Sequence, residues 1–126
     1  MRNKLYKLLL FLPSLFYYSL IFFLSSKSYQ VNIEIFFFDK GIHIIEFGVL
    51  GFLLSLGFFT FSLSFKNKFI LVFTIGSFLA VLDEIHQFFV PMRTMEAFDL
   101  AADILGIGLG FFIFNYIYKK TGESLF

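Results

Sequence analysis

Cysteine and tryptophan are absent from this chain of 126 residues, proline occurs only twice, and only 15% of the residues are charged. Without cysteine the chain has no disulfide framework, no thiol nucleophile and no zinc–thiolate site. The net charge is +1 and no dense basic stripe exists, so nothing in the sequence points to nucleic-acid binding. Because about a quarter of the residues in a soluble domain are usually charged, so low a charge is untypical of a protein surrounded by water.

Apolar residues fill most of the chain: 59% are hydrophobic, and 23 are phenylalanine. They gather in four runs, each about long enough for a membrane-spanning helix of roughly 20 residues. We expect these helices near residues 5–24, 40–62, 68–90 and 97–118. The connections are short, which predicts antiparallel neighbours in a compact bundle. The sequence therefore predicts an all-α fold, an integral membrane four-helix bundle in a single domain over residues 1–126.

Polar residues mark the predicted connections, at residues 25–38, 64–68 and 91–96. Basic residues before the first apolar run are also typical of a signal peptide. However, the run from Leu8 to Leu24 is long and no A-x-A-like cleavage site follows it. We therefore expect a retained first helix.

Lysine and arginine predict the orientation, because they are enriched in cytoplasmic segments. The larger group of basic residues falls at one end of the predicted bundle: Arg2, Lys4, Lys7, Lys66, Lys68, Lys119 and Lys120. The other end has only Lys27, Lys40 and Arg93. Since an even number of spans brings both termini to the same side, both termini are predicted to be cytoplasmic.

Ionisable residues interrupt the apolar runs near the predicted outer surface. Charged groups are costly in hydrocarbon, so each needs a partner, a wet cavity or a function. Asp39, His43 and Glu46 lie at the start of the second predicted helix, and their spacing puts them on one stripe. Further candidates follow at the outer ends of the third and fourth helices: Asp83, Gln87, Asp99 and Asp103. Three helices are thus expected to bring polar side chains to one depth.

Helical geometry predicts which of the remaining charges face outward. Glu84 lies about 100° around the helix from Asp83, so we expect it at the surface. His86 lies off the stripe formed by Asp83 and Gln87, and we expect it to face lipid headgroups. Lys40 is expected to be a charge at the membrane interface.

Gly106 and Gly110 continue the helix face that carries Asp99 and Asp103. A ridge of small residues at this spacing lets two membrane helices approach closely. We therefore expect these glycines to pack the fourth helix against a neighbour, with the two aspartates pointing into the bundle.

The polar residues form an ordered set along the chain. They are Ser25, Ser26, Asp39, Lys40, His43, Glu46, Asp83, Glu84, Gln87, Pro91, Arg93, Asp99 and Asp103, together with Phe47, Gly106 and Gly110. This set resembles the VanZ-like family over about the whole chain. Phe47 stands where the family commonly has tyrosine, and Met92 stands where glycine is common.

The resemblance implies a small multi-pass protein of the bacterial cytoplasmic (inner) membrane. The family is named for a member linked to resistance to the glycopeptide teicoplanin. It supplies no biochemical mechanism, so the chemistry has to be argued from the side chains themselves.

The leading hypothesis is a polar pocket open to the outer leaflet, which binds or modifies a membrane lipid or a lipid-linked cell-envelope intermediate. His43 or Glu46 would be the base, Asp83 the partner acid, and Arg93 a clamp for phosphate or carboxylate. The expected substrate-binding residues are Asp39, Gln87, Arg93, Asp99 and Asp103. Two alternatives stay open: a binding protein without catalysis, and a structural protein whose polar network only fixes helix packing.

No cofactor follows from the sequence. Oxygen ligands and one imidazole suit a divalent cation, but no metal motif such as H-E-x-x-H is present. The candidate ligands are Asp39, His43, Glu46, Asp83 and Asp103. A Ser-His-Asp arrangement of Ser26, His43 and Asp83 is a further alternative.

Overall fold

The computed structural model describes residues 4–25, 33–91 and 97–121, with the backbone alone described for Ser25 and residues 33–39. The described chain is helical throughout, apart from turns and short connections, and contains no strand. Its helices are α1 (Lys4–Leu9), α2 (Leu12–Ser25), α3 (Ile33–Phe58), α4 (Phe65–Phe88) and α5 (Ala97–Thr121). The prediction of an all-α protein is confirmed.

Four helical stretches are long and apolar enough to cross a membrane: Lys4–Leu24, Lys40–Phe58, Phe65–Phe88 and Ala97–Thr121. They agree with the predicted spans to within a few residues. Many large apolar side chains on them are exposed, including Phe16, Ile45 and Phe98 at about 70%. Water-soluble proteins rarely expose apolar surface on this scale, whereas lipid would cover it.

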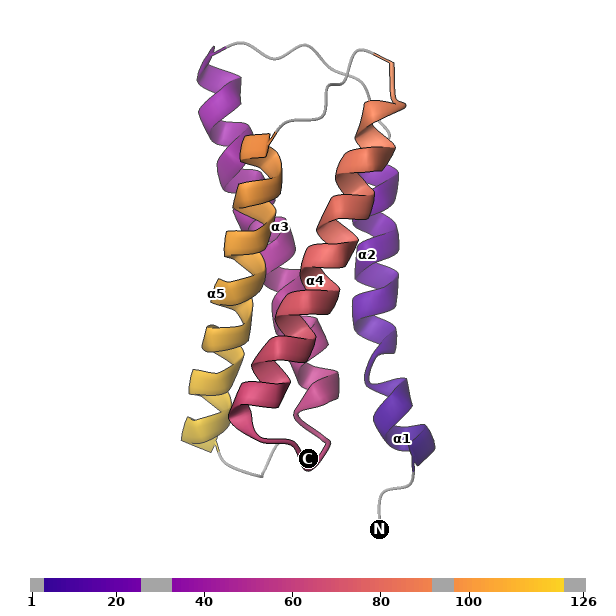
Figure 1. Cartoon of the computed structure of the whole chain (residues 1–126), viewed down its shortest axis with the longest axis vertical. Helices are drawn as coiled ribbons and strands as arrows, with labels where there is room; N and C mark the ends of the chain where they lie inside the picture. The colour runs from indigo at the N-terminus through magenta and orange to yellow at the C-terminus, as the bar shows by residue number, and fades with distance from the viewer. Residues whose placement is uncertain (1–3, 26–32, 92–96, 122–126) are drawn as a thin grey trace.

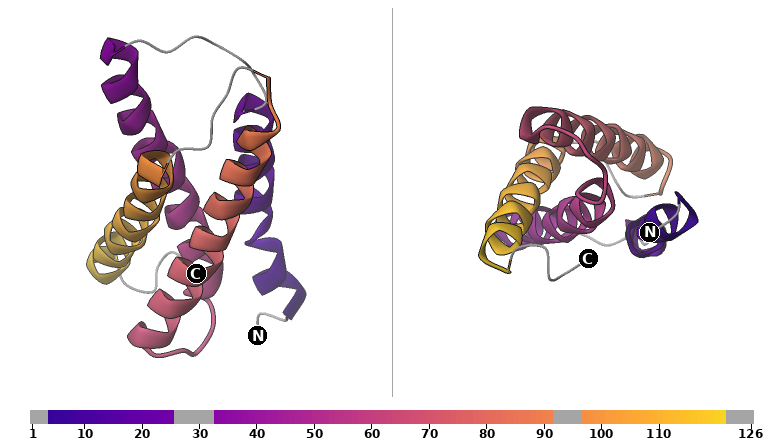
Figure 2. Two further views of the ribbon diagram at one scale, coloured as in Figure 1. Left: turned by 45° about the horizontal axis from the view of Figure 1, so that its top comes forward. Right: turned by 90° about the horizontal axis from the view of Figure 1, so that it is seen from below.

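Successive long helices reverse direction in Figure 1, where the chain rises through α1 and α2, descends in α3, rises in α4 and descends in α5. The first turns of α3 and α5 and the last turns of α4 therefore lie at the upper end in this view. Figure 2 shows α3, α4 and α5 grouped together, with α1 and α2 to one side. The most extensive packing is between α3 and α5.

The first predicted helix is interrupted between α1 and α2. Pro13, the second residue of α2, has no N–H, and its ring would clash with the Leu9 carbonyl in a continuous helix. Proline is tolerated in a first helical turn, so the helix restarts here. The Ser14 hydroxyl donates a hydrogen bond of 2.7 Å to the Phe11 carbonyl within this turn.

α3 is displaced relative to its predicted range of 40–62. It begins at Ile33, because residues 33–40 contain neither glycine nor proline to stop a helix. The polar connection predicted up to residue 38 is therefore wrong. At the other end the chain tightens after Phe58, where the Thr60 N–H donates to the Gly57 carbonyl at 3.3 Å.

α4 starts three residues earlier than predicted. Ser64 is its N-cap, and the Ser64 hydroxyl accepts a hydrogen bond of 3.1 Å from the Asn67 N–H. Serine favours this position because it satisfies a backbone donor that has no partner within the helix. Residues 65–68, predicted as part of a connection, therefore form the first turn of α4.

Glycines bring the backbones of α3 and α5 into direct contact. A Cβ atom added at Gly51 would lie 2.5 Å from the Ile107 carbonyl oxygen, too close for any real side chain. Added Cβ atoms at Gly106 and Gly110 would likewise collide with the backbone of α3, in the second case at Gly48. Gly106 and Gly110 thus lie where the two helices are closest.

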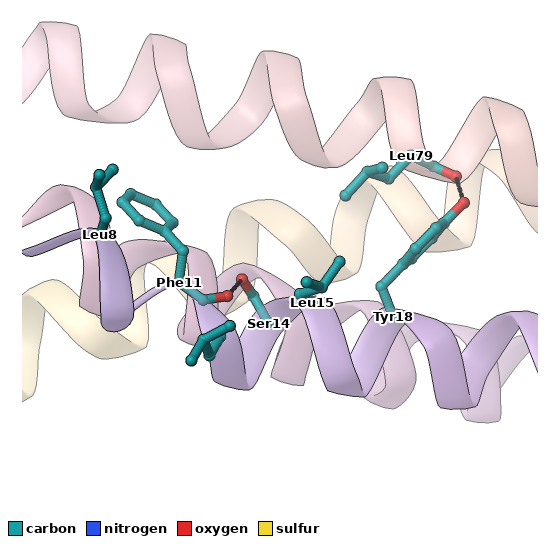
Figure 3. Close-up of a pocket in the computed structure, with 7 residues that line it drawn as sticks. Leu8, Phe11, Ser14, Leu15, Tyr18 and Leu79 are labelled. Atoms are coloured by element: carbon teal, nitrogen blue, oxygen red, sulfur yellow. Dashed lines mark hydrogen bonds between the residues drawn. The ribbon is translucent and has the colours of Figure 1, made fainter. Parts of the chain in front are cut away.

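α2 joins the other helices through fewer contacts. The Tyr18 hydroxyl donates a hydrogen bond of 2.7 Å to the Leu79 carbonyl of α4. Below this bond, an apolar cavity of about 360 Å³ separates α1 and α2 from α4, and its lining includes Phe11, Ser14 and Leu15 (Figure 3). Its walls carry no charged side chain, so the cavity lacks groups for acid–base or metal chemistry.

We predict that Gly110→Ala destabilises the protein by about 1 to 3 kcal/mol, because the added methyl group must push α5 away from α3. Gly108→Ala is the matched control on the same helix, since a Cβ there meets only Phe73, at 4.0 Å. Unfolding in detergent, followed by circular dichroism, measures both. Equal stability of the two variants would contradict this account of the α3–α5 contact.

Candidate functional site

Two polar stripes meet where α3 and α5 pack at the upper end of the bundle. His43 Nδ1 lies 2.7 Å from Asp103 Oδ1, and His43 Nε2 lies 3.8 Å from Asp99 Oδ2. Lys40 Nζ donates to Asp99 Oδ1. The spacing explains these contacts, because residues three or four apart share one helix face, so 40 and 43 face 99 and 103.

These side chains are withdrawn from the surface. His43 is 4% exposed, Asp99 is 2% exposed and Asp103 is fully buried. Hydrogen bonds and ion pairs are stronger in such surroundings than in water, and a missing partner is correspondingly costly. Asp103 Oδ2 is buried and receives no hydrogen bond from any residue in the described ranges.

Lys40 differs from its prediction as an interface charge. Its side chain is only 15% exposed and it is paired with Asp99. The signal was present in the sequence: Lys40 precedes His43 by three residues, and Asp99 precedes Asp103 by four. Lys40 therefore lies one helical turn before His43, and Asp99 lies one turn before Asp103, the partner of His43. Lys40 faces Asp99 in the same way that His43 faces Asp103.

α4 contributes three more buried polar side chains, Asp83, Glu84 and Gln87. The Gln87 amide donates a hydrogen bond of 3.1 Å to Asp83 Oδ2. Glu84, expected at the surface, is only 2% exposed. One ligand atom each of Glu84, His43 and Asp103 lie within 4.8 Å of one another. Glu84, like Lys40, is therefore a site residue that sequence reasoning missed.

Glu84 is buried because of the position of α4, which packs against α2, α3 and α5. A helix with three neighbours buries more than one stripe, so Asp83 and Glu84 can both point inward although they differ by about 100°. His86 was expected to face headgroups, but its ring stacks on Phe22 of α2 with 4.0 Å between centroids.

The sequence also suggested Ser26, Asp39, Glu46 and Arg93 as site residues. Glu46 is partly buried on α3, near enough to Tyr17 of α2 to interact electrostatically. Arg93 and Ser26 lie outside the described residues, and only the backbone of Asp39 is described, within α3. The structure therefore brings together six side chains, which we name the polar cluster: Lys40, His43, Asp83, Glu84, Asp99 and Asp103.

The polar cluster combines a proton-transfer group with an arrangement that orients it. Asp103 holds the imidazole of His43 through Nδ1, which leaves Nε2 near Asp99. A carboxylate that fixes one ring nitrogen determines which nitrogen can exchange a proton. An imidazole held in this way can act as an acid or base, and carboxylates are hard ligands for a cation.

Four apolar helices around a buried polar cluster define a helical protein of the membrane type. The family model described as VanZ/LLP1 matches residues 2–118, nearly the whole chain. The chain therefore belongs to the VanZ/LLP1 family, which confirms the resemblance noted in the sequence. No curated protein and no solved structure matches it.

The contact between His43 and Asp103 should appear as energetic coupling. We predict that His43→Leu and Asp103→Ala each destabilise the protein, because each leaves a buried polar partner, and that the double variant loses less than their sum. We expect a coupling of about 1 to 2 kcal/mol, measured by denaturant unfolding in detergent.

Asn115 on α5 provides the control for this cycle. It lies twelve residues beyond Asp103, about 18 Å along the helix. Asn115→Ala combined with His43→Leu should therefore be additive. Additivity of the His43 and Asp103 variants as well would show that the two side chains do not interact energetically.

Proposed function

We propose that this VanZ/LLP1 protein binds a lipid-linked cell-envelope component by its polar headgroup, at the upper end of an antiparallel four-helix bundle in the bacterial cytoplasmic membrane. The observation that carries the proposal is the polar cluster, in which α3, α4 and α5 each contribute ionisable side chains at one depth. Burying so many such groups is costly, which favours a chemical role over simple packing. A neighbouring bilayer supplies lipid headgroups at this depth.

The distribution of lysines supports the orientation. In the described residues, the lower end in Figure 1 carries Lys4, Lys7, Lys66, Lys68, Lys119 and Lys120, whereas the upper end carries Lys40. Because basic residues concentrate on the cytoplasmic side, the lower end faces the cytoplasm and the polar cluster faces outward. The cluster then lies beneath the outer leaflet, where envelope intermediates are exposed after export.

His43 is the proton-transfer residue in this proposal. Asp103 orients its ring, and the ion pair between Lys40 and Asp99 lies on the other side of the imidazole. Glu84 and Asp83 present carboxylates from α4, with Gln87 holding Asp83 in place. Such a set suits hydroxyl, amine or cation-bridged phosphate groups of a lipid headgroup. By resemblance to the member for which the family is named, the physiological result is protection against teicoplanin.

Fusions to reporter proteins test the orientation. A fluorescent protein joined after Thr121 should fluoresce in bacterial cells, because that end is cytoplasmic. Alkaline phosphatase joined after Val90, in a chain truncated there, should be active, because that end is outside the membrane. Activity of phosphatase fused after Thr121 would reverse the assignment and place the polar cluster on the cytoplasmic side.

Antibiotic susceptibility tests the function. We predict that His43→Gln and Asp103→Asn remove the protection that the intact chain gives bacterial cells against teicoplanin, at equal membrane abundance of protein. His86→Gln makes the same chemical change outside the polar cluster and should retain protection. Minimal inhibitory concentrations, divided by abundance from immunoblots, give the comparison.

The outcomes separate the three hypotheses. If the cluster only fixes helix packing, protection falls in proportion to abundance in every variant. If the protein binds without catalysis, protection is lost per molecule but mass spectrometry of lipid extracts finds no product that depends on the intact chain. Unchanged protection per molecule in His43→Gln and Asp103→Asn would contradict the proposed function.

A further inference from the structure

Within the polar cluster, three side chains of metal-ligand type converge from three helices. One atom each from His43 of α3, Glu84 of α4 and Asp103 of α5 lie within 4.8 Å of one another. All three residues are at most 4% exposed. Glu84 belongs to this set, although the sequence pointed to Glu46 as the glutamate ligand.

The charge balance of the cluster favours a bound cation. Its members are four buried acids and two bases: Asp83, Glu84, Asp99, Asp103, Lys40 and His43. With all six ionised, four negative charges stand against two positive charges in the described part of the chain. A cation bound among these carboxylates would offset part of the cost of burying them.

Asp103 provides an independent sign of a ligand. Its Oδ1 is in hydrogen-bond contact with His43 Nδ1 at 2.7 Å, but its Oδ2 is buried without a donor among the described residues. A buried carboxylate oxygen without a donor carries the full cost of leaving water. Coordination to a cation would remove that cost.

The geometry points to a divalent metal site formed by His43, Glu84 and Asp103, which binds a first-row transition metal ion such as Zn²⁺ or Mn²⁺. An imidazole beside two carboxylates suits these ions, whereas Mg²⁺ and Ca²⁺ prefer sites made of oxygen alone. Three protein ligands leave a position open for water or for an oxygen of a headgroup. The site goes beyond the proposed function, because ion binding requires no lipid.

Binding needs only a small closure of the site. Around a tetrahedral ion with bonds of about 2.1 Å, ligand atoms lie about 3.4 Å apart, so a pair of ligand atoms at the 4.8 Å limit must approach by about 1.4 Å. Asp103 would bind the ion through Oδ2 and His43 would bind it as a neutral imidazole, since ligands bind metal in their deprotonated form.

Metal binding to the full-length protein in detergent tests the site. After treatment with a chelator, the protein is dialysed against Zn²⁺ or Mn²⁺ and the bound ion is counted by mass spectrometry. We expect one ion per chain, with Mg²⁺ at equal concentration unable to displace it. His43→Gln, Glu84→Gln and Asp103→Asn should each weaken binding by at least about tenfold, which is the lower end of the loss seen even for outer-shell partners.

Matched controls come from the same chain. His86→Gln and Glu46→Gln make the same chemical changes outside the ligand set and should bind the ion as the intact protein does. The site is overturned if no ion binds, or if the three ligand variants bind as tightly as these controls, which would mark an adventitious ion only. Because the assay contains no envelope lipid, failure of the susceptibility test leaves its result unaffected.

A measurement on the intact protein tests the site even if the variants fail to fold. Pulsed electron paramagnetic resonance of bound Mn²⁺ detects nitrogen in the first coordination shell, and we expect one imidazole nitrogen, from His43. A spectrum without nitrogen coupling would overturn the site. Circular dichroism of each variant shows whether a loss of binding reflects a lost ligand or a lost fold.

Discussion

The close approach of α3 and α5 is the constraint on which the rest of the structure depends. Gly51 and Gly110 leave no room for a side chain between the two backbones. His43 and Asp103 lie just above this contact, and their 2.7 Å separation follows from it. In a membrane, apolar side chains gain little from leaving lipid, so close van der Waals packing and interhelical polar contacts hold such helices together. The glycines allow the close van der Waals packing, and they bring the two helices near enough for polar side chains to contact one another.

The fold was largely predictable because a membrane-spanning helix has a length and composition that the sequence displays directly. The helix ends were less predictable. Local chemistry explains two of them: Pro13 divides the first span, and Ser64 starts α4 earlier than expected. Both residues are visible in the sequence. However, each lies within or next to a long apolar run, and the predicted helix ends followed those runs. The early start of α3 followed from the lack of any residue that stops a helix.

The polar cluster was only partly predictable. Spacing along α5 correctly suggested that Asp99 and Asp103 share the face of Gly106 and Gly110, because one helix and one neighbour define one stripe. That reasoning failed for Glu84, since the burial of α4 depends on how many helices surround it. Neighbour number is a property of the assembled bundle, and no periodicity within a single helix reports it.

The two ends of the bundle show why the polar cluster is difficult to explain as packing alone. At the lower end, Phe59 packs on Phe114 and Phe111 with ring centroids 4.9 and 5.7 Å apart, and no buried charge is needed to join α5 to the end of α3. Buried ion pairs seldom stabilise a protein more than well-packed apolar residues of similar volume. Aromatic side chains could therefore pack the same two helices together at both ends. Instead, their upper end buries His43 and Asp103 at a cost that a ligand, a proton or an ion can offset.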